Sequence, residues 1–101
     1  MSDGNKKIIV NFFQSIDCEF CKKLKPIIDD LLNENDTIEL INVDWEKNQK
    51  ICKDRNINHV PVISFDIGEY EMKRIYGVKE KQEYQSIIDN LLEIYEYIVT
   101  E

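Results

Sequence analysis

Residues 8–32 read IIVNFFQSIDCEFCKKLKPIIDDLL, and they place a Cys-X-X-Cys pair between two different hydrophobic patterns. Before the pair, residues 8–13 form a short apolar run of β-branched and aromatic side chains, which predicts a buried strand. After it, apolar residues recur on one face of a helix, whose expected N-cap is Ser15 or Asp17. The stretch therefore predicts a strand-to-helix junction that carries both cysteines.

The rest of the chain continues with segments of the same kinds. Strands are expected at 38–43 and on both sides of a turn at 66–69, a weak helix within 46–56, and an amphipathic helix with its apolar stripe at 84–98. Gly68 is placed to take a positive φ in the turn. The order β-α-β-α-β-β-α, with a right-handed first crossover, predicts an α/β fold with a four-stranded mixed sheet flanked by helices. We expect one domain over residues 1–101.

Composition narrows the possible partners and location. Lys and Arg number 13 against 20 Asp and Glu, a net charge of −7, which disfavours nucleic acid and anionic membranes as partners. No apolar run reaches the ~20 residues that a bilayer requires. The first residues lack an apolar signal core, and three cysteines fit a secreted disulfide framework poorly. We therefore expect a cytoplasmic protein, and nothing indicates more than a monomer.

The spacing of the cysteines suggests a redox pair. Free N–H groups at a helix start stabilise an anion, so the Cys18 thiolate is favoured over that of an ordinary thiol. Cys21, one turn further on, can attack a mixed disulfide formed at Cys18. Asp17 and Glu19 disfavour the thiolate, and Lys22 partly offsets them. A thiolate that is only weakly stabilised favours a reductant.

Two other chemistries use this spacing. Structural zinc requires four N or S ligands, and Cys52 and His59 lie at intervals that match no common zinc finger. A purely structural disulfide is disfavoured in a chain without an export signal. We therefore expect no metal and no cofactor besides the redox-active Cys18–Cys21 disulfide. Cys52 is expected to be a buried apolar residue, with a regulatory thiol as the alternative. His59 is expected to be a solvated loop residue, with tuning of the thiolate as the alternative.

With these features established, most of the chain resembles the thioredoxin superfamily. The matching motifs, in order, are VNFF (10–13), CEFCKKLKPII (18–28), INVDW (41–45), NINHVPVISFDIGE (56–69) and IYGV (75–78). The resemblance implies that Pro61 is a cis-proline facing the cysteine pair and that the Val60 backbone pairs with an extended substrate. It also implies that Gly77 leaves space beside this groove and that Ile16 and Phe20 provide apolar contacts to a substrate.

The chain departs from the thioredoxin pattern at several positions. Glu19-Phe20 replaces the usual Gly-Pro between the cysteines, and Asp17 replaces the usual Trp before them. Asn11 aligns with a buried Asp that is thought to accept the proton of the resolving cysteine. Because an amide cannot serve as that base near neutral pH, attack by Cys21 is expected to be slower or to be assisted by another group.

The resemblance implies a thiol–disulfide oxidoreductase that reduces protein disulfides and contributes to cell redox homeostasis. A thioredoxin-reductase-like enzyme or glutathione would recycle it. Two alternatives remain open. The length of the chain and the aromatic residue before Cys21 are similar to glutaredoxins, which suggests a protein that uses glutathione or binds an iron–sulfur cluster, although YGVKEKQEY (76–84) lacks the expected glutathione-binding signature. The other alternative is an interaction module with a redox-inert thioredoxin fold.

Overall fold

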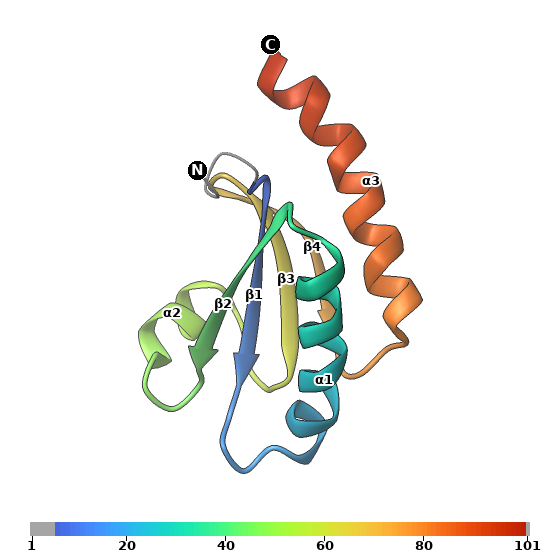
Figure 1. Cartoon of the computed structure of the whole chain (residues 1–101). Coiled ribbons are helices and arrows are strands. Elements are labelled where there is room, and N and C mark those ends of the chain that lie inside the picture. Colours follow the sequence, from blue (N-terminus) through green and yellow to red (C-terminus); the bar gives the residue numbers. More distant parts are fainter. Residues whose placement is uncertain (1–5, 101) are drawn as a thin grey trace.

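The structure is a computed structural model, and it describes residues 6–100. The secondary-structure elements of this part follow the expected order β-α-β-α-β-β-α (Figure 1). They are β1 (Ile8–Gln14), α1 (Glu19–Glu34), β2 (Ile38–Asp44), α2 (Gln49–Asp54), β3 (Val62–Ile67), β4 (Tyr70–Tyr76) and α3 (Lys81–Thr100). The α/β fold class is confirmed. Gly68 has the expected positive φ, 61°, in the turn between β3 and β4.

The sheet is mixed, with strand order β2-β1-β3-β4. β1 pairs in parallel with β2 and antiparallel with β3, and β3 pairs antiparallel with β4. β1 is therefore central, which explains why its apolar residues form a nearly continuous run. The register between β1 and β2 runs from Ile8↔Ile38 to Gln14↔Asp44, so the carboxyl ends of both strands meet at one edge of the sheet. The segment with the cysteines begins at that edge.

The helices cover opposite faces of the sheet. α1 and α3 bury their apolar faces on one side, where fully buried residues such as Leu24 and Ile88 pack against strand residues such as Phe12. Each of these large apolar side chains contributes about 1.5–3 kcal/mol by leaving water. On the other side, α2 covers a smaller cluster around Phe13 and Cys52. The larger core lies between α1 and the sheet. Packing in this core therefore holds α1, with Cys18 at its start and Cys21 in its first turn, in place on the sheet.

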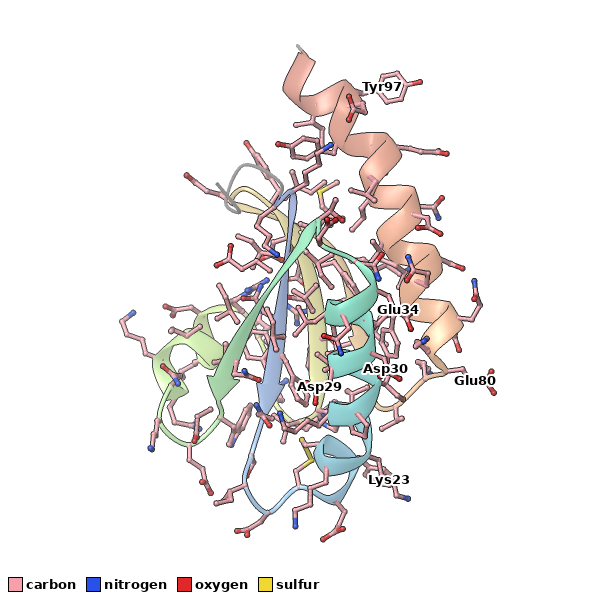
Figure 2. The ribbon with its side chains drawn as sticks, viewed as in Figure 1. Lys23, Asp29, Asp30, Glu34, Glu80 and Tyr97 are labelled. Atoms are coloured by element: carbon pink, nitrogen blue, oxygen red, sulfur yellow. A yellow bond between two sulfur atoms is a disulfide. The ribbon has the colours of Figure 1, made fainter. Side chains whose placement is uncertain are left out.

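Polar contacts join the end of α1 to the start of α3. Lys81 forms an ion pair with Glu34 at 2.8 Å, and Figure 2 shows Glu34 on α1 where this helix lies beside α3. Asn35 and Gln85 donate side-chain hydrogen bonds to each other at 2.8 and 2.9 Å. These contacts hold the first turns of α3 against the end of α1.

The far end of α3 differs from the expected apolar stripe at 84–98. Tyr84 and Ile88 are buried as expected, but Ile98 is 42% exposed. The last turns of α3 extend past the end of the sheet (Figure 1), and Ile98 lines an open hollow with strand residues such as Ile8 and Ile67 instead of packing in the core. Tyr97 projects from this end of the helix (Figure 2). Among the described residues, no helix is both long enough and apolar enough to span a membrane.

Candidate active site

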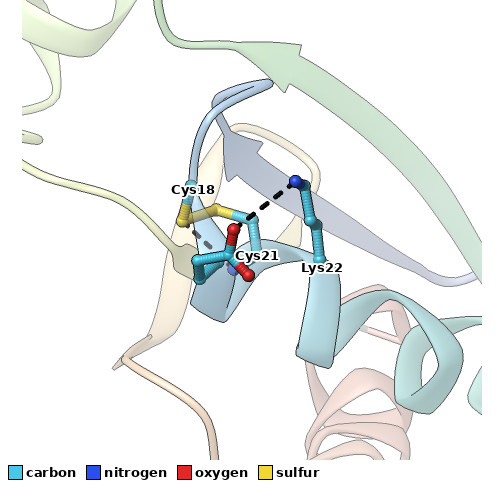
Figure 3. The surroundings of a disulfide bond; sticks show 4 residues. Cys18, Cys21 and Lys22 are labelled. Carbon is cyan, nitrogen blue, oxygen red and sulfur yellow. Dashed lines mark hydrogen bonds and ion pairs between the residues drawn. A yellow bond between two sulfur atoms is a disulfide. The ribbon is translucent and has the colours of Figure 1, made fainter.

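The first turn of α1 is capped by a cysteine sulfur. Cys18 is the N-cap, with extended backbone, and its Sγ accepts a hydrogen bond from the Cys21 N–H at 3.1 Å (Figure 3). The expected cap, Ser15 or Asp17, is wrong because the chain turns earlier, with the Cys18 N–H donating to the Ser15 carbonyl at 3.2 Å. The sulfur therefore sits at the positive end of the helix dipole.

The two sulfurs are bonded to each other and differ in accessibility. Cys18 and Cys21 form a disulfide, with Cα atoms 5.2 Å apart. Cys21 is only 2% exposed and belongs to the main core, whereas Cys18 is partly exposed and packs at the edge of that core. An incoming reactant can therefore reach the Cys18 sulfur directly, while Cys21 is accessible only through its partner.

Charged residues surround Cys18 on the solvent side. Glu19 and Lys22 form an ion pair at 3.6 Å (Figure 3), and both side chains are largely exposed. An exposed pair of this kind contributes at most about 1 kcal/mol. Asp17 is exposed, and its carboxylate has no ion-pair or hydrogen-bond partner within residues 6–100. The proposed influence of these residues on the Cys18 thiolate remains a prediction.

An open groove passes the Cys18 sulfur at the carboxyl edge of the sheet. Phe20 and Val60 line it together with Cys18. The Val60–Pro61 peptide bond is cis, as expected. Pro61 is buried, and its carbonyl accepts a hydrogen bond from Gly77 at 3.2 Å. In the described part of the chain, the Val60 N–H and C=O have no hydrogen-bond partner. The groove therefore combines a reactive sulfur, an apolar wall and unpaired backbone groups.

Three of the residues that the sequence assigned to substrate binding, Ile16, Pro61 and Gly77, are not among those that line this groove, and their roles remain predictions. Ile16 is 76% exposed and lines a neighbouring hollow beside Asn42. Gly77 has a φ of 77°, and a Cβ added there would meet no atom within 4 Å. Its structural requirement is therefore the positive φ rather than close packing. Phe20, 59% exposed, does line the groove.

Four further residues line the groove, and of these the sequence suggested a possible role at the site only for His59. Trp45 and Glu46 directly follow β2, and Asn58 and His59 precede Val60. The sequence could have indicated Trp45 and Glu46. The first two predicted strands are parallel and end at the same edge of the sheet, and the first of them leads to the cysteines. His59 lies at the rim, with its ring 5.3 Å from the ring of Tyr76.

Asn11 is buried on the face of the sheet that α2 covers, and it belongs to a polar network. Its Nδ2 donates to Ser64 Oγ at 3.1 Å and to Asp66 Oδ2 at 2.8 Å. Arg55 donates to the other oxygen of Asp66 at 3.2 Å and to Glu71 at 2.9 Å. The amide thus supplies a donor to a carboxylate, which an Asp at position 11 would instead repel. This network accounts for Asn11, and slower attack by Cys21 remains a prediction.

Cys52 occupies the second core cluster, away from the disulfide. It is a free thiol, 1% exposed, and burial raises its pKa. Within residues 6–100, no group of three His, Cys, Asp or Glu side chains is arranged to hold a metal ion.

A disulfide at the start of a helix, with one sulfur accessible and the other buried, defines a thiol–disulfide oxidoreductase in general terms. The comparisons with known proteins agree with this class. The family model described as Thioredoxin matches residues 1–90. The chain belongs to the thioredoxin family.

Two curated proteins of Arabidopsis thaliana are similar in sequence. NADPH-dependent thioredoxin reductase 3 is 30% identical over 84 residues, which cover 82% of this chain and 16% of that protein. Thioredoxin-like 1-3, chloroplastic, is 34% identical over 65 residues, which cover 64% of this chain and 23% of that protein. The chain thus corresponds to less than a quarter of the length of either relative.

Solved thioredoxins share the fold. A thioredoxin mutant from Halobacterium salinarum superposes with a TM-score of 0.79 and 16% identity, over 88% of this chain and 78% of that chain. Thioredoxin-2 of the malaria parasite gives 0.79 and 20% identity, over 83% and 82% of the two chains. Schistosoma mansoni thioredoxin gives 0.75 and 20% identity, over 87% and 82%. At these identities the superpositions establish the fold alone.

Proposed function

We propose that this domain is a protein disulfide reductase that works through the Cys18–Cys21 pair. One observation carries the proposal, namely that the partly exposed sulfur of Cys18 lies in an open groove and is bonded to the buried sulfur of Cys21. This difference in exposure sets the order in which the cysteines react. Only Cys18 is accessible to a bulky substrate, so it must react before Cys21.

In the reduced protein, the Cys18 thiolate attacks one sulfur of a substrate disulfide. A Cys18–substrate bond forms, the substrate S–S bond breaks, and the leaving thiolate takes up a proton from water. Cys21 then loses its proton and attacks the Cys18 sulfur, which releases the second substrate thiol and forms the Cys18–Cys21 disulfide. Two electrons pass from the dithiol to the substrate, and no bound cofactor is needed.

The groove supplies the binding contacts for this reaction. The free backbone groups of Val60 can pair with an extended substrate segment, as an added strand pairs with a sheet edge. Phe20 offers apolar surface beside the sulfur. We propose that a substrate segment lies between these two residues, so that its disulfide faces Cys18.

The oxidised protein needs an external reductant. Similarity to part of an NADPH-dependent thioredoxin reductase supports recycling by an enzyme of that kind, with glutathione as the alternative donor. A reducing compartment such as the cytoplasm suits this cycle, because it keeps thiols reduced.

Reduction of insulin disulfides by dithiothreitol tests the proposal. The wild type should accelerate the reaction and Cys18→Ser should abolish the acceleration, whereas Cys21→Ser should accumulate stable mixed disulfides with insulin, visible by mass spectrometry. Cys52→Ala is the matched control, since it removes a cysteine outside the groove, and its rate should stay within about twofold of the wild type. Circular dichroism would confirm that each variant is folded. Acceleration by Cys18→Ser at the wild-type rate would refute the proposal.

A further inference from the structure

Carboxylates from two separate parts of the chain line the groove beside Cys18. Asp17 immediately precedes Cys18, and Glu46 follows β2. Glu19, the first residue of α1, lines the same groove. In the described part of the chain, no Lys or Arg lines this groove. The lining of the groove is therefore negative, while Lys22 pairs with Glu19 and the Nζ of Lys23 lies 5.4 Å from the centre of the Phe20 ring.

Two of these carboxylates remain uncompensated. Glu19 is neutralised in part by its ion pair with Lys22. Asp17 and the side chain of Glu46 have no ion-pair or hydrogen-bond partner among residues 6–100, and both residues are exposed. The overall charge of −7 has the same sign and adds to the local field. A binding segment with its own positive charges would supply the missing partners.

The groove also offers apolar and aromatic surface. Phe20 and Trp45 line it, and Val60 carries the unpaired backbone groups. An extended segment would therefore place its backbone against Val60 and its flanking side chains within reach of Asp17 and Glu46. Acidic flanking side chains would be repelled at both positions.

We propose that the preferred substrates are disulfides in extended segments with Lys or Arg next to the reacting cysteine. This inference rests on the proposed function and specifies the substrate class of the same groove. Complementary charge raises the rate of encounter more than the strength of the final complex, and salt screens it. The selectivity is therefore expressed as a rate that falls with ionic strength.

The test uses three cyclic peptides of equal length whose single cystine is flanked by Lys, Gln or Glu. The second-order rate constant for oxidation of the reduced protein is measured with each peptide, at ionic strengths of about 0.02 M and 0.5 M. Each value is divided by the rate constant of the same peptide with dithiothreitol, a neutral dithiol. This division removes differences in the intrinsic reactivity of the peptides.

At low ionic strength, the normalised rate should be about fivefold higher with the Lys peptide than with the Gln peptide, and about fivefold lower with the Glu peptide. Both ratios should approach one at high ionic strength. Glu46→Lys should reduce the ratio of the Lys to the Glu peptide by about fivefold or more. Glu93→Lys is the matched control, because it makes the same charge change at an exposed site on α3 and should preserve the ratio.

The outcomes separate the two proposals. Equal normalised rates for all three peptides at both ionic strengths, with turnover intact, would overturn the charge selectivity and leave the reductase standing. Loss of the same selectivity in Glu93→Lys would also overturn it, since the field would then be global rather than local. Failure to oxidise the protein with any peptide would instead refute the proposed function.

Discussion

Replacing Asn11 by Asp is expected to destabilise the protein in a pH-dependent way. The substitution preserves the shape of the side chain but removes the Nδ2 donor that lies 2.8 Å from Asp66 Oδ2. The new carboxylate would face an existing one at hydrogen-bonding distance, and Arg55 can compensate only part of the repulsion. The pair therefore has to hold a proton at neutral pH or separate.

Two estimates bound the loss in the free energy of unfolding that this substitution should cause. Loss of a hydrogen bond to a charged group costs about 1.5–3 kcal/mol. Protonating a carboxyl with an ordinary pKa of about 3.9 at pH 7 costs about 4 kcal/mol, which is the upper limit if the pair keeps a proton. We expect the free energy of unfolding to fall by about 2–4 kcal/mol at pH 7. Because the folded pair has a raised pKa, this loss is absent below the unfolded pKa and grows as the pH rises towards the folded value.

Urea unfolding at about pH 5.5 and pH 7 measures the effect, since the loss should shrink by up to about 2 kcal/mol at the lower pH. The control is Asn42→Asp, which adds the same charge at an exposed position on β2 and should change stability by no more than about 0.5 kcal/mol. A loss for Asn11→Asp that is below this value, or equal at both pH values, would refute the argument.

Three further predictions concern other parts of the fold. The Arg74 hydrogen bond lowers the pKa of Glu71, so Glu71→Gln should cost about 1–3 kcal/mol at pH 7; because the folded pKa is depressed, the cost should shrink in urea titrations as the pH falls below about 4.3. Tyr84→Phe removes the hydroxyl that accepts from the Lys79 N–H at 2.9 Å, and thermal unfolding should show a loss of about 1 kcal/mol; an unchanged midpoint would contradict the role of this bond. In the reduced native protein, mass spectrometry should find that iodoacetamide modifies Cys52 about 100-fold more slowly than the active-site nucleophile, and similar rates would contradict its burial.

The order of elements and the redox pair could be predicted from the sequence because local patterns encode them. The apolar run of β1 and the change to helical spacing after Cys21 follow from burial alone. The cis bond before Pro61 came from the resemblance to the superfamily, since no local pattern specifies it. The apolar stripe of α3 is buried as predicted at Tyr84 and Ile88 but not at Ile98. The spacing of apolar residues along a helix does not show where the sheet beneath it ends.

The features that could not be predicted depend on register and tertiary contact. Asp66 and Glu71 become partners only when β3 pairs with β4, and Arg55, at the end of α2, reaches both only because of the tertiary fold. The sulfur of Cys18 caps α1 after a backbone turn. N-cap preferences had instead indicated the hydroxyl of Ser15 or the carboxylate of Asp17. Trp45 and Glu46, by contrast, could have been assigned to the groove, because the predicted parallel pairing of the first two strands makes both end at one edge of the sheet.

The direction of α3 has a practical consequence. The beginning of β1 and the last turns of α3 both lie at the end of the sheet opposite the start of α1 (Figure 1), the helix that Cys18 caps. A linker, tag or solid support attached beyond either element would hold the molecule with its reactive end pointing outward. Trapping experiments that use immobilised protein, and fusions to other modules, should therefore leave the groove unobstructed.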